Sequence, residues 1–126
     1  MKKLICFLFG LLLCFTCFAQ SFEIYCASVG EDGDVTISFE QQTNSDFLEY
    51  RVSKWDNTTA GFVNCGVVSD ASQAVYTDNT QQTANGSVRY RIEAVYTSGQ
   101  IFQDEITTIF LTAVQNPNNI VNLSWN

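Results

Sequence analysis

The sequence contains no histidine. Histidine is the usual base of Ser-His-Asp and Cys-His catalytic systems and the commonest zinc ligand, so sites of these kinds are excluded. No glycine-rich phosphate-binding loop occurs. Asp104 and Glu105 are neighbours on an expected strand, where their side chains point to opposite faces and cannot form the facing carboxylate pair of a glycoside hydrolase. We therefore expect no catalytic activity and no cofactor.

Basic residues are scarce, and two of the six lie at the N-terminus. A basic start at residues 1–3, an uncharged apolar run at residues 4–18 and small residues at Cys17 and Ala19 are typical of a secretory signal peptide over residues 1–19. The run is shorter than the roughly 20 residues of a membrane-spanning helix, and no basic flank follows it. We expect a protein that is secreted or held at the cell surface, with no membrane span once the signal is removed.

Without the signal peptide, the chain keeps all thirteen acidic residues. The basic residues that remain are Arg51, Lys54, Arg89 and Arg91. An acidic surface of this kind repels nucleic acids and anionic membranes, so we expect neither of them as a partner.

Only two cysteines, Cys26 and Cys65, lie outside the signal peptide. In an oxidising compartment they can form a disulfide that closes a loop of about forty residues and stabilises the fold by roughly 2–4 kcal/mol. The alternative is a pair of buried free thiols that act as small apolar side chains. Both remain open, because the sequence does not show whether the two Cα atoms come close enough.

No segment after the signal peptide shows the apolar period of an amphipathic helix. The chain instead contains about seven short stretches of alternating polarity separated by polar turns, at residues 21–29, 35–39, 47–55, 62–68, 74–76, 88–96 and 105–111. This pattern predicts an all-β fold, an antiparallel β-sandwich of the immunoglobulin-like kind. A small closed β-barrel is the alternative.

The stretch at residues 88–96 has the clearest pattern. Its apolar and aromatic residues alternate with Arg89, Arg91 and Glu93, so one face is expected to be buried and the other to face water. Gly99 lies in the turn that follows, where a positive φ is needed.

Proline occurs once, at Pro117, within a polar segment at residues 113–119 that suits a linker. In the next segment, residues 120–126, the residues 121–126 repeat the polarity pattern of residues 35–40, and Leu123 lies 86 residues after Ile37 (123 − 37 = 86). An offset of one domain length predicts a tandem repeat whose second copy begins here, so that the chain is the head of a longer array. The alternatives are chance similarity and a last strand of the same sandwich.

Two features suggest binding sites. Glu31, Asp32 and Asp34 lie on one turn and could together hold Ca²⁺, although their spacing is not that of an EF-hand and a solvated acidic turn is the simpler alternative. Trp55 ends a strand just before a turn, where an exposed aromatic ring could form a platform for a ligand such as a sugar. Its alternative role is to cap the end of the core.

Residues 22–112 resemble a fibronectin type III domain. The motifs that carry the resemblance are Val35-x-Ile37-x-Phe39, Tyr50-x-Val52, Val75-Tyr76-Thr77-Asp78 and Tyr90-x-Ile92-x-Ala94 followed by Gly99. The family usually has Trp at the position of Phe39, and Leu123-Ser124-Trp125 matches the second strand of a following copy better than Phe39 matches the first.

The end of the signal at Phe18-Ala19-Gln20, the segment at residues 108–111 and the final LSWN are similar to large surface proteins of gliding Bacteroidetes, often exported by the type IX route. Such proteins carry a C-terminal sorting domain, which this sequence does not include. The resemblance implies a spacer or adhesion module whose partner is a protein or polysaccharide at the cell surface. Alternatives are an accessory module of a secreted polysaccharide-degrading enzyme, or a free-standing carbohydrate-binding protein in which Leu123 and Trp125 pack into this domain.

Overall fold

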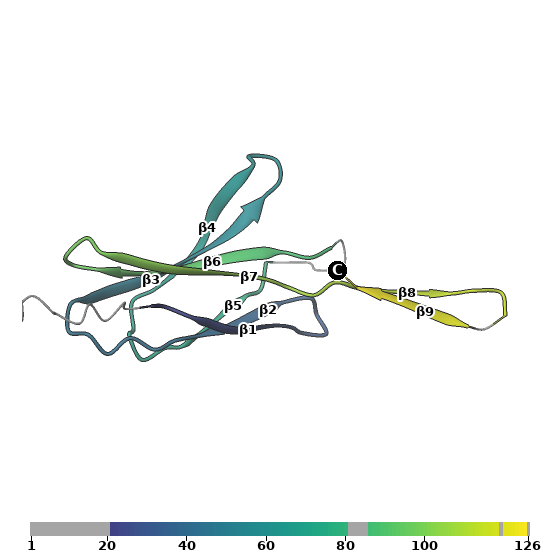
Figure 1. Cartoon of the computed structure of the whole chain (residues 1–126), viewed down its shortest axis with the longest axis horizontal. Helices are drawn as coiled ribbons and strands as arrows, with labels where there is room; N and C mark the ends of the chain where they lie inside the picture. The colour runs from purple at the N-terminus through teal and green to yellow at the C-terminus, as the bar shows by residue number, and fades with distance from the viewer. Residues whose placement is uncertain (1–20, 81–85, 119, 126) are drawn as a thin grey trace, which may run out of the picture.

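The computed structural model describes residues 21–80, 86–118 and 120–125, so the predicted signal peptide at residues 1–19 lies outside the described part. The described residues are all-β and contain nine strands (Figure 1). The strands are β1 (Ile24–Val29), β2 (Val35–Phe39), β3 (Phe47–Asp56), β4 (Gly61–Val68), β5 (Val75–Asp78), β6 (Arg89–Tyr96), β7 (Ile101–Thr107), β8 (Leu111–Gln115) and β9 (Val121–Trp125).

Seven of these strands form two antiparallel sheets that pack face to face, with the order β1-β2-β5 in one and β4-β3-β6-β7 in the other (Figure 1). The expected β-sandwich is therefore confirmed. In immunoglobulin constant-type sandwiches the fourth strand joins the first sheet. Here β4 pairs with β3 in the second sheet, and the turn end of β3 and β4 bends away from the sandwich.

The core lies between the inner faces of the two sheets. The side chains that are wholly buried come from β2, β3 and β6, and they are Val35, Ile37, Phe39, Tyr50, Val52, Tyr90, Ile92 and Ala94. They alternate along each strand with exposed or half-buried polar residues, as the period-two pattern predicted. Gly99 has a φ of 84° in the turn between β6 and β7, as expected there.

The buried polar groups of the sandwich are paired. The Asp78 carboxylate, on β5, accepts hydrogen bonds from Lys54 Nζ at 3.0 Å and from the Tyr90 hydroxyl at 3.0 Å. Burial alone would raise the pKa of Asp78, but hydrogen bonds from Thr80, Lys54 and Tyr90 outweigh it and hold the pKa below its ordinary value. Asp78 thus joins the small sheet to β3 and β6 by a charged contact.

Strand β7 lies four residues earlier than the sequence pattern predicted, at Ile101–Thr107 instead of residues 105–111. Phe102 and Ile106 pack against the core, but Asp104 stands between them and breaks the apolar alternation. Its carboxylate accepts the backbone N–H of Ile24 at 2.9 Å, which joins β7 to β1. Because an inward acidic residue interrupts the apolar alternation, the sequence pattern does not show where this strand begins.

Strands β8 and β9 form a separate two-stranded hairpin that extends the molecule beyond the sandwich (Figure 1). Residues 113–115 of the expected linker belong to β8, so the linker prediction is wrong for these residues. Pro117 lies in the turn between the two strands.

Candidate functional site

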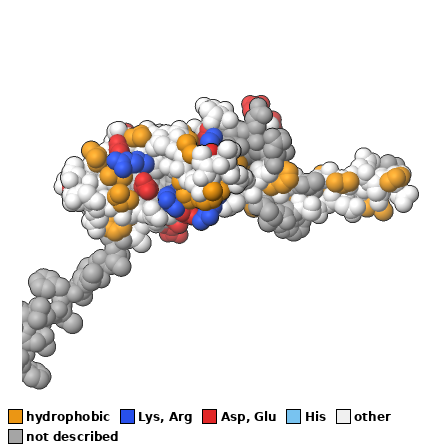
Figure 2. Space-filling model, turned by 90° about the horizontal axis from the view of Figure 1, so that it is seen from above, with side chains coloured by type: hydrophobic (Ala, Val, Ile, Leu, Met, Phe, Trp, Pro, Cys, Tyr) orange, Lys and Arg blue, Asp and Glu red, His pale blue; other side chains and the backbone are white. Residues whose placement is uncertain are grey.

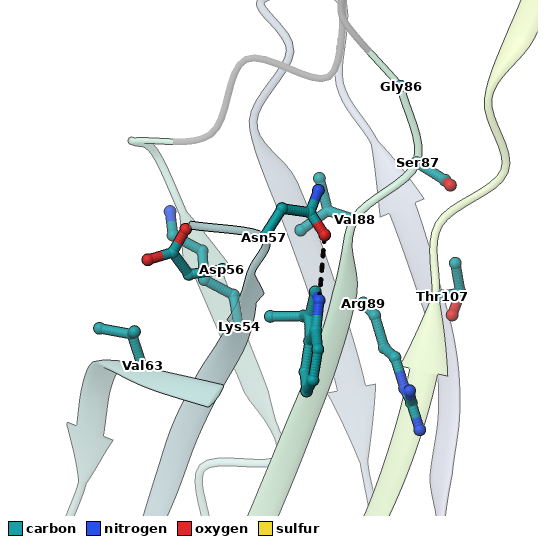
Figure 3. Close-up of a pocket in the computed structure, with 10 residues that line it drawn as sticks. Lys54, Asp56, Asn57, Val63, Gly86, Ser87, Val88, Arg89 and Thr107 are labelled. Atoms are coloured by element: carbon teal, nitrogen blue, oxygen red, sulfur yellow. Dashed lines mark hydrogen bonds between the residues drawn. The ribbon is translucent and has the colours of Figure 1, made fainter. Parts of the chain in front are cut away.

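A pocket of about 650 Å³ lies beside the end of β3 (Figure 3). Its lining comes from four places: Trp55 and Asn57 at the end of β3 and in the turn after it, Val63 on β4, Val88 and Arg89 at the start of β6, and Thr107 at the end of β7. The pairing of β3 with both β4 and β6 brings these segments together.

Trp55 is held in this pocket by contacts on several sides. Its indole N–H donates to Asn57 Oδ1 at 3.0 Å, drawn as the dashed line in Figure 3. Its ring meets Phe62 edge to face with centroids 5.3 Å apart, and the Arg89 guanidinium lies 6.0 Å from its centroid. Trp55 remains 37% exposed.

The two arginines beside Trp55 share one carboxylate. Arg89 and Arg91 both pair with Glu105 across β6 and β7, and the Arg91 guanidinium lies 3.9 Å from the Phe62 ring centroid. Hydrogen bonds from Arg91 and Arg89 hold the pKa of Glu105 below its ordinary value. The exposed Trp55 ring beside these residues offers a flat apolar face on which a ligand can stack.

The residues around Trp55 were missed by sequence reasoning. Phe62, Arg89, Arg91 and Glu105 come from three strands, and no motif joins them in the chain. The available signal was the outward position of Arg89 and Arg91 in the alternation of β6. It indicated which face they occupy, but not that an aromatic pair shares that face.

The three carboxylates of the acidic turn do not gather into one cluster. Among the described residues, no three acidic, cysteine or histidine side chains lie together in a way that could hold a metal ion, so Glu31, Asp32 and Asp34 do not converge. The turn is closed by its backbone, with the Gly30 N–H donating to the Asp34 carbonyl at 2.9 Å. The structure therefore adds no support to the calcium hypothesis.

Of the two alternatives that the sequence leaves open, the structure contains free thiols at both Cys26 and Cys65 and no disulfide between them. Cys26 lies on β1, on the flank where β1 meets β7, whereas Cys65 lies on β4, on the flank where the Tyr76 hydroxyl of β5 donates to the Cys65 carbonyl at 2.6 Å. The two thiols are thus on opposite flanks of the sandwich. Cys26 is exposed beside Ser38, so it is not the buried thiol that we considered as the alternative to a disulfide. Cys65 comes nearer to that description, because it is half-buried and its pKa is raised by burial and by the Asp78 charge.

The β8–β9 hairpin exposes several large apolar side chains and carries no charged residue. No charged residue occurs after Glu105, and Figure 2 shows hydrophobic and uncharged groups alone along this extension, whereas charged and hydrophobic side chains mix on the sandwich. The large apolar side chains of the hairpin that are more than half exposed are Leu111, Val114, Ile120, Val121 and Leu123. Such a surface is typical of an interaction site.

The described residues include no helix that is long and apolar enough to cross a membrane. A scan against models of protein families, a search of curated proteins and a search of solved structures each gave no match for this chain.

Proposed function

We propose that the protein is a non-catalytic extracellular module, a sandwich of the fibronectin type III kind, that serves as a spacer or adhesion domain of a larger surface protein. The observation that carries the proposal is that the sandwich closes around its own core, after which the chain continues as a hairpin that joins neither sheet. A segment of this kind suits a connection to something outside the sandwich.

The direction of the chain supports a role as a spacer. The described chain enters β1 at one end of the sandwich, and the β8–β9 hairpin extends from the opposite end (Figure 1). Modules with entry and exit at opposite ends add their lengths when they are joined in a row. Strand β4, paired with β3 in the larger sheet, and the motifs that resemble the family support the fibronectin type III assignment.

The test is the size of the native polypeptide. An antibody against residues 21–107 is used to blot the source cells and their medium. A band several times larger than the 14.1 kDa of this chain supports a module of a larger surface protein. A band at or below 14.1 kDa contradicts it.

Trp55 supports a second candidate function, the binding of carbohydrate. Its ring is exposed at the edge of a pocket and fixed by Asn57 and Phe62, which is how an aromatic platform would be prepared for a sugar ring. One structural expectation of a free-standing carbohydrate-binding protein is wrong, however. Leu123 is 55% exposed and its strand pairs only with β8, so it does not pack into the sandwich.

The carbohydrate hypothesis is tested by retention of residues 21–126 on insoluble cellulose, chitin and starch. Trp55→Ala should abolish retention, whereas Tyr25→Ala, at another exposed aromatic residue, should leave it unchanged. If the parent protein is not retained on any of the three, or if both variants lose retention equally, Trp55 is not a carbohydrate platform.

A further inference from the structure

The two N-terminal strands and the two C-terminal strands pair in the same register. In β1 and β2 the paired residues include Ala27↔Ile37, Ser28↔Thr36 and Val29↔Val35. In β8 and β9 they include Ala113↔Leu123, Val114↔Asn122 and Gln115↔Val121. Each residue of the second set lies 86 positions after its counterpart in the first (113 − 27 = 86, 121 − 35 = 86), so the turns between the strands are also equal in length.

The match also preserves which face is apolar. On β2 the inward residues are Val35, Ile37 and Phe39, and the corresponding positions of β9 hold Val, Leu and Trp. The outward Thr36 and Ser38 correspond to Asn and Ser. A slip of one residue would have moved every apolar side chain to the other face. The offset of 86 residues that matches the pairing therefore also matches the apolar face of the two hairpins.

One irregularity is not shared. Strand β1 has a bulge between Ile24 and Cys26, and β8 has none. Leu111 therefore follows Ile24 by 87 positions, although both pair with the aromatic residue at the end of the second strand. The bulge adds one residue without changing which side chains face inward.

The two hairpins differ in what covers them. Val35 and Ile37 are 0% exposed, whereas Val121 and Leu123 are 54% and 55% exposed. The surface that covers β2 is the inner face of the β4-β3-β6-β7 sheet, and its centre consists of Tyr50, Val52, Tyr90, Ile92 and Ala94. The β8–β9 hairpin carries no charge, so an apolar surface of that chemistry complements it.

We propose that β8 and β9 are the first two strands of a second sandwich, and that the face formed by Leu111, Ala113, Val121 and Leu123 binds the inner face of a second four-stranded sheet like β4-β3-β6-β7. The partner of this surface is thus a module of the same fold. The inference rests on the proposed function, because a second sandwich requires that the protein be built of several modules.

The proposal is tested by moving the second hairpin into the place of the first. In residues 21–126, the segment 26–39 is replaced by the sequence of residues 112–125, which has the same length and keeps the offset of 86. The control replaces segment 26–39 by the sequence of residues 111–124. It has almost the same composition, but every side chain faces the opposite way.

The in-register graft should unfold in urea in one cooperative transition with the slope of the parent protein, because that slope scales with the surface buried on folding. The slipped graft should show no cooperative transition. Equal behaviour of two folded grafts overturns the proposal, because the apolar face would then have no role.

If neither graft folds, a smaller graft decides. The variant T36N/I37L/F39W places the sequence of β9 in β2 and leaves β1 and the turn unchanged. A cooperative transition with the slope of the parent supports the proposal, and its loss overturns it. If all three grafts fail to fold and the native polypeptide is large, the assignment of the hairpin is wrong but the modular function stands. If the grafts fold and the native band lies at or below 14.1 kDa, the modular function is contradicted.

Discussion

The hairpins β1–β2 and β8–β9 share their register, turn length and apolar pattern, yet one lies in the core and the other stands in solvent. Strand β2 has β5 at its other edge and the larger sheet above it, whereas β8 and β9 have only each other. A two-stranded hairpin alone is marginally stable in water. The pairing of the two strands is thus encoded locally, whereas the stability of the pair depends on the sheet that covers it.

The largest expected difference lies between equivalent positions of the two hairpins. Ile37→Ala should lower the free energy of unfolding of residues 21–126 by about 2–5 kcal/mol, because it leaves a cavity in the core. Leu123→Ala should change it by about 0.5 kcal/mol or less, since the side chain is mostly in solvent. Urea denaturation measures both values. Equal losses would show that β9 is packed against the sandwich and would remove the contrast.

A second test weakens the anchoring of β5, the strand that borders the first hairpin and has no counterpart beside the second. Val35 of β2 is paired with Asp78 of β5, and Asp78 binds Lys54 and Tyr90. Asp78→Asn should cost about 1–3 kcal/mol at pH 7, because charged hydrogen bonds are replaced by weaker neutral ones. Asp32→Asn, on the exposed acidic turn, is the control and should have almost no effect.

The same carboxylate makes stability depend on pH. The pKa of Asp78 is lower in the folded protein than in the unfolded chain, so its contribution is present above the unfolded pKa of about 4 and is lost as the pH falls through the folded pKa. Urea denaturation from pH 7 to pH 2 should show a smaller loss of stability for Asp78→Asn than for the parent. Parallel curves for the two proteins would contradict this role. No titratable side chain occurs between residues 106 and 126, so the second hairpin contributes nothing to the effect.

A smaller effect is expected from the exposed aromatic residue of the sandwich. Trp55→Ala should destabilise the protein by about 0.5–1.5 kcal/mol, the usual contribution of an aromatic pair, because Trp55 contacts Phe62. Val114→Ala, on the outward face of β8, should lie within about 0.5 kcal/mol of the parent. Thermal unfolding of the two variants measures the difference. A larger effect of Val114→Ala would mean that β8 is covered by another surface.

The last prediction concerns reactivity and leaves stability unchanged. Cys26 lies exposed on β1, whereas Cys65 on β4 is half-buried with a raised pKa. Iodoacetamide should therefore label Cys26 before Cys65 in the native protein, as mass spectrometry of timed samples can show. Failure of both thiols to react until a reductant is added would mean that they form a disulfide.

Much of the sandwich could be predicted from its sequence. The alternation in β2 and β6 predicted the buried faces, because one side of each strand faces the core and the other faces water. Apolar residues therefore occupy every second position. The start of β7 could not be predicted, because Asp104 faces inward and is satisfied by the backbone of Ile24, 80 residues away. The surroundings of Trp55 were hidden for the same reason, since Phe62 and Arg89 reach it from neighbouring strands.

By itself, the sequence determined the all-β class, the inward faces of the strands and the repeat of one hairpin pattern after 86 residues. These are local properties, set by the two-residue period of a strand and by its turns. Only the tertiary structure decided that Cys26 and Cys65 lie on opposite flanks, that Asp104 joins two strands, and that one hairpin is covered while its counterpart is exposed. Each of these features depends on which distant strands become neighbours. That arrangement is set by the burial of the apolar faces of all the strands in one core.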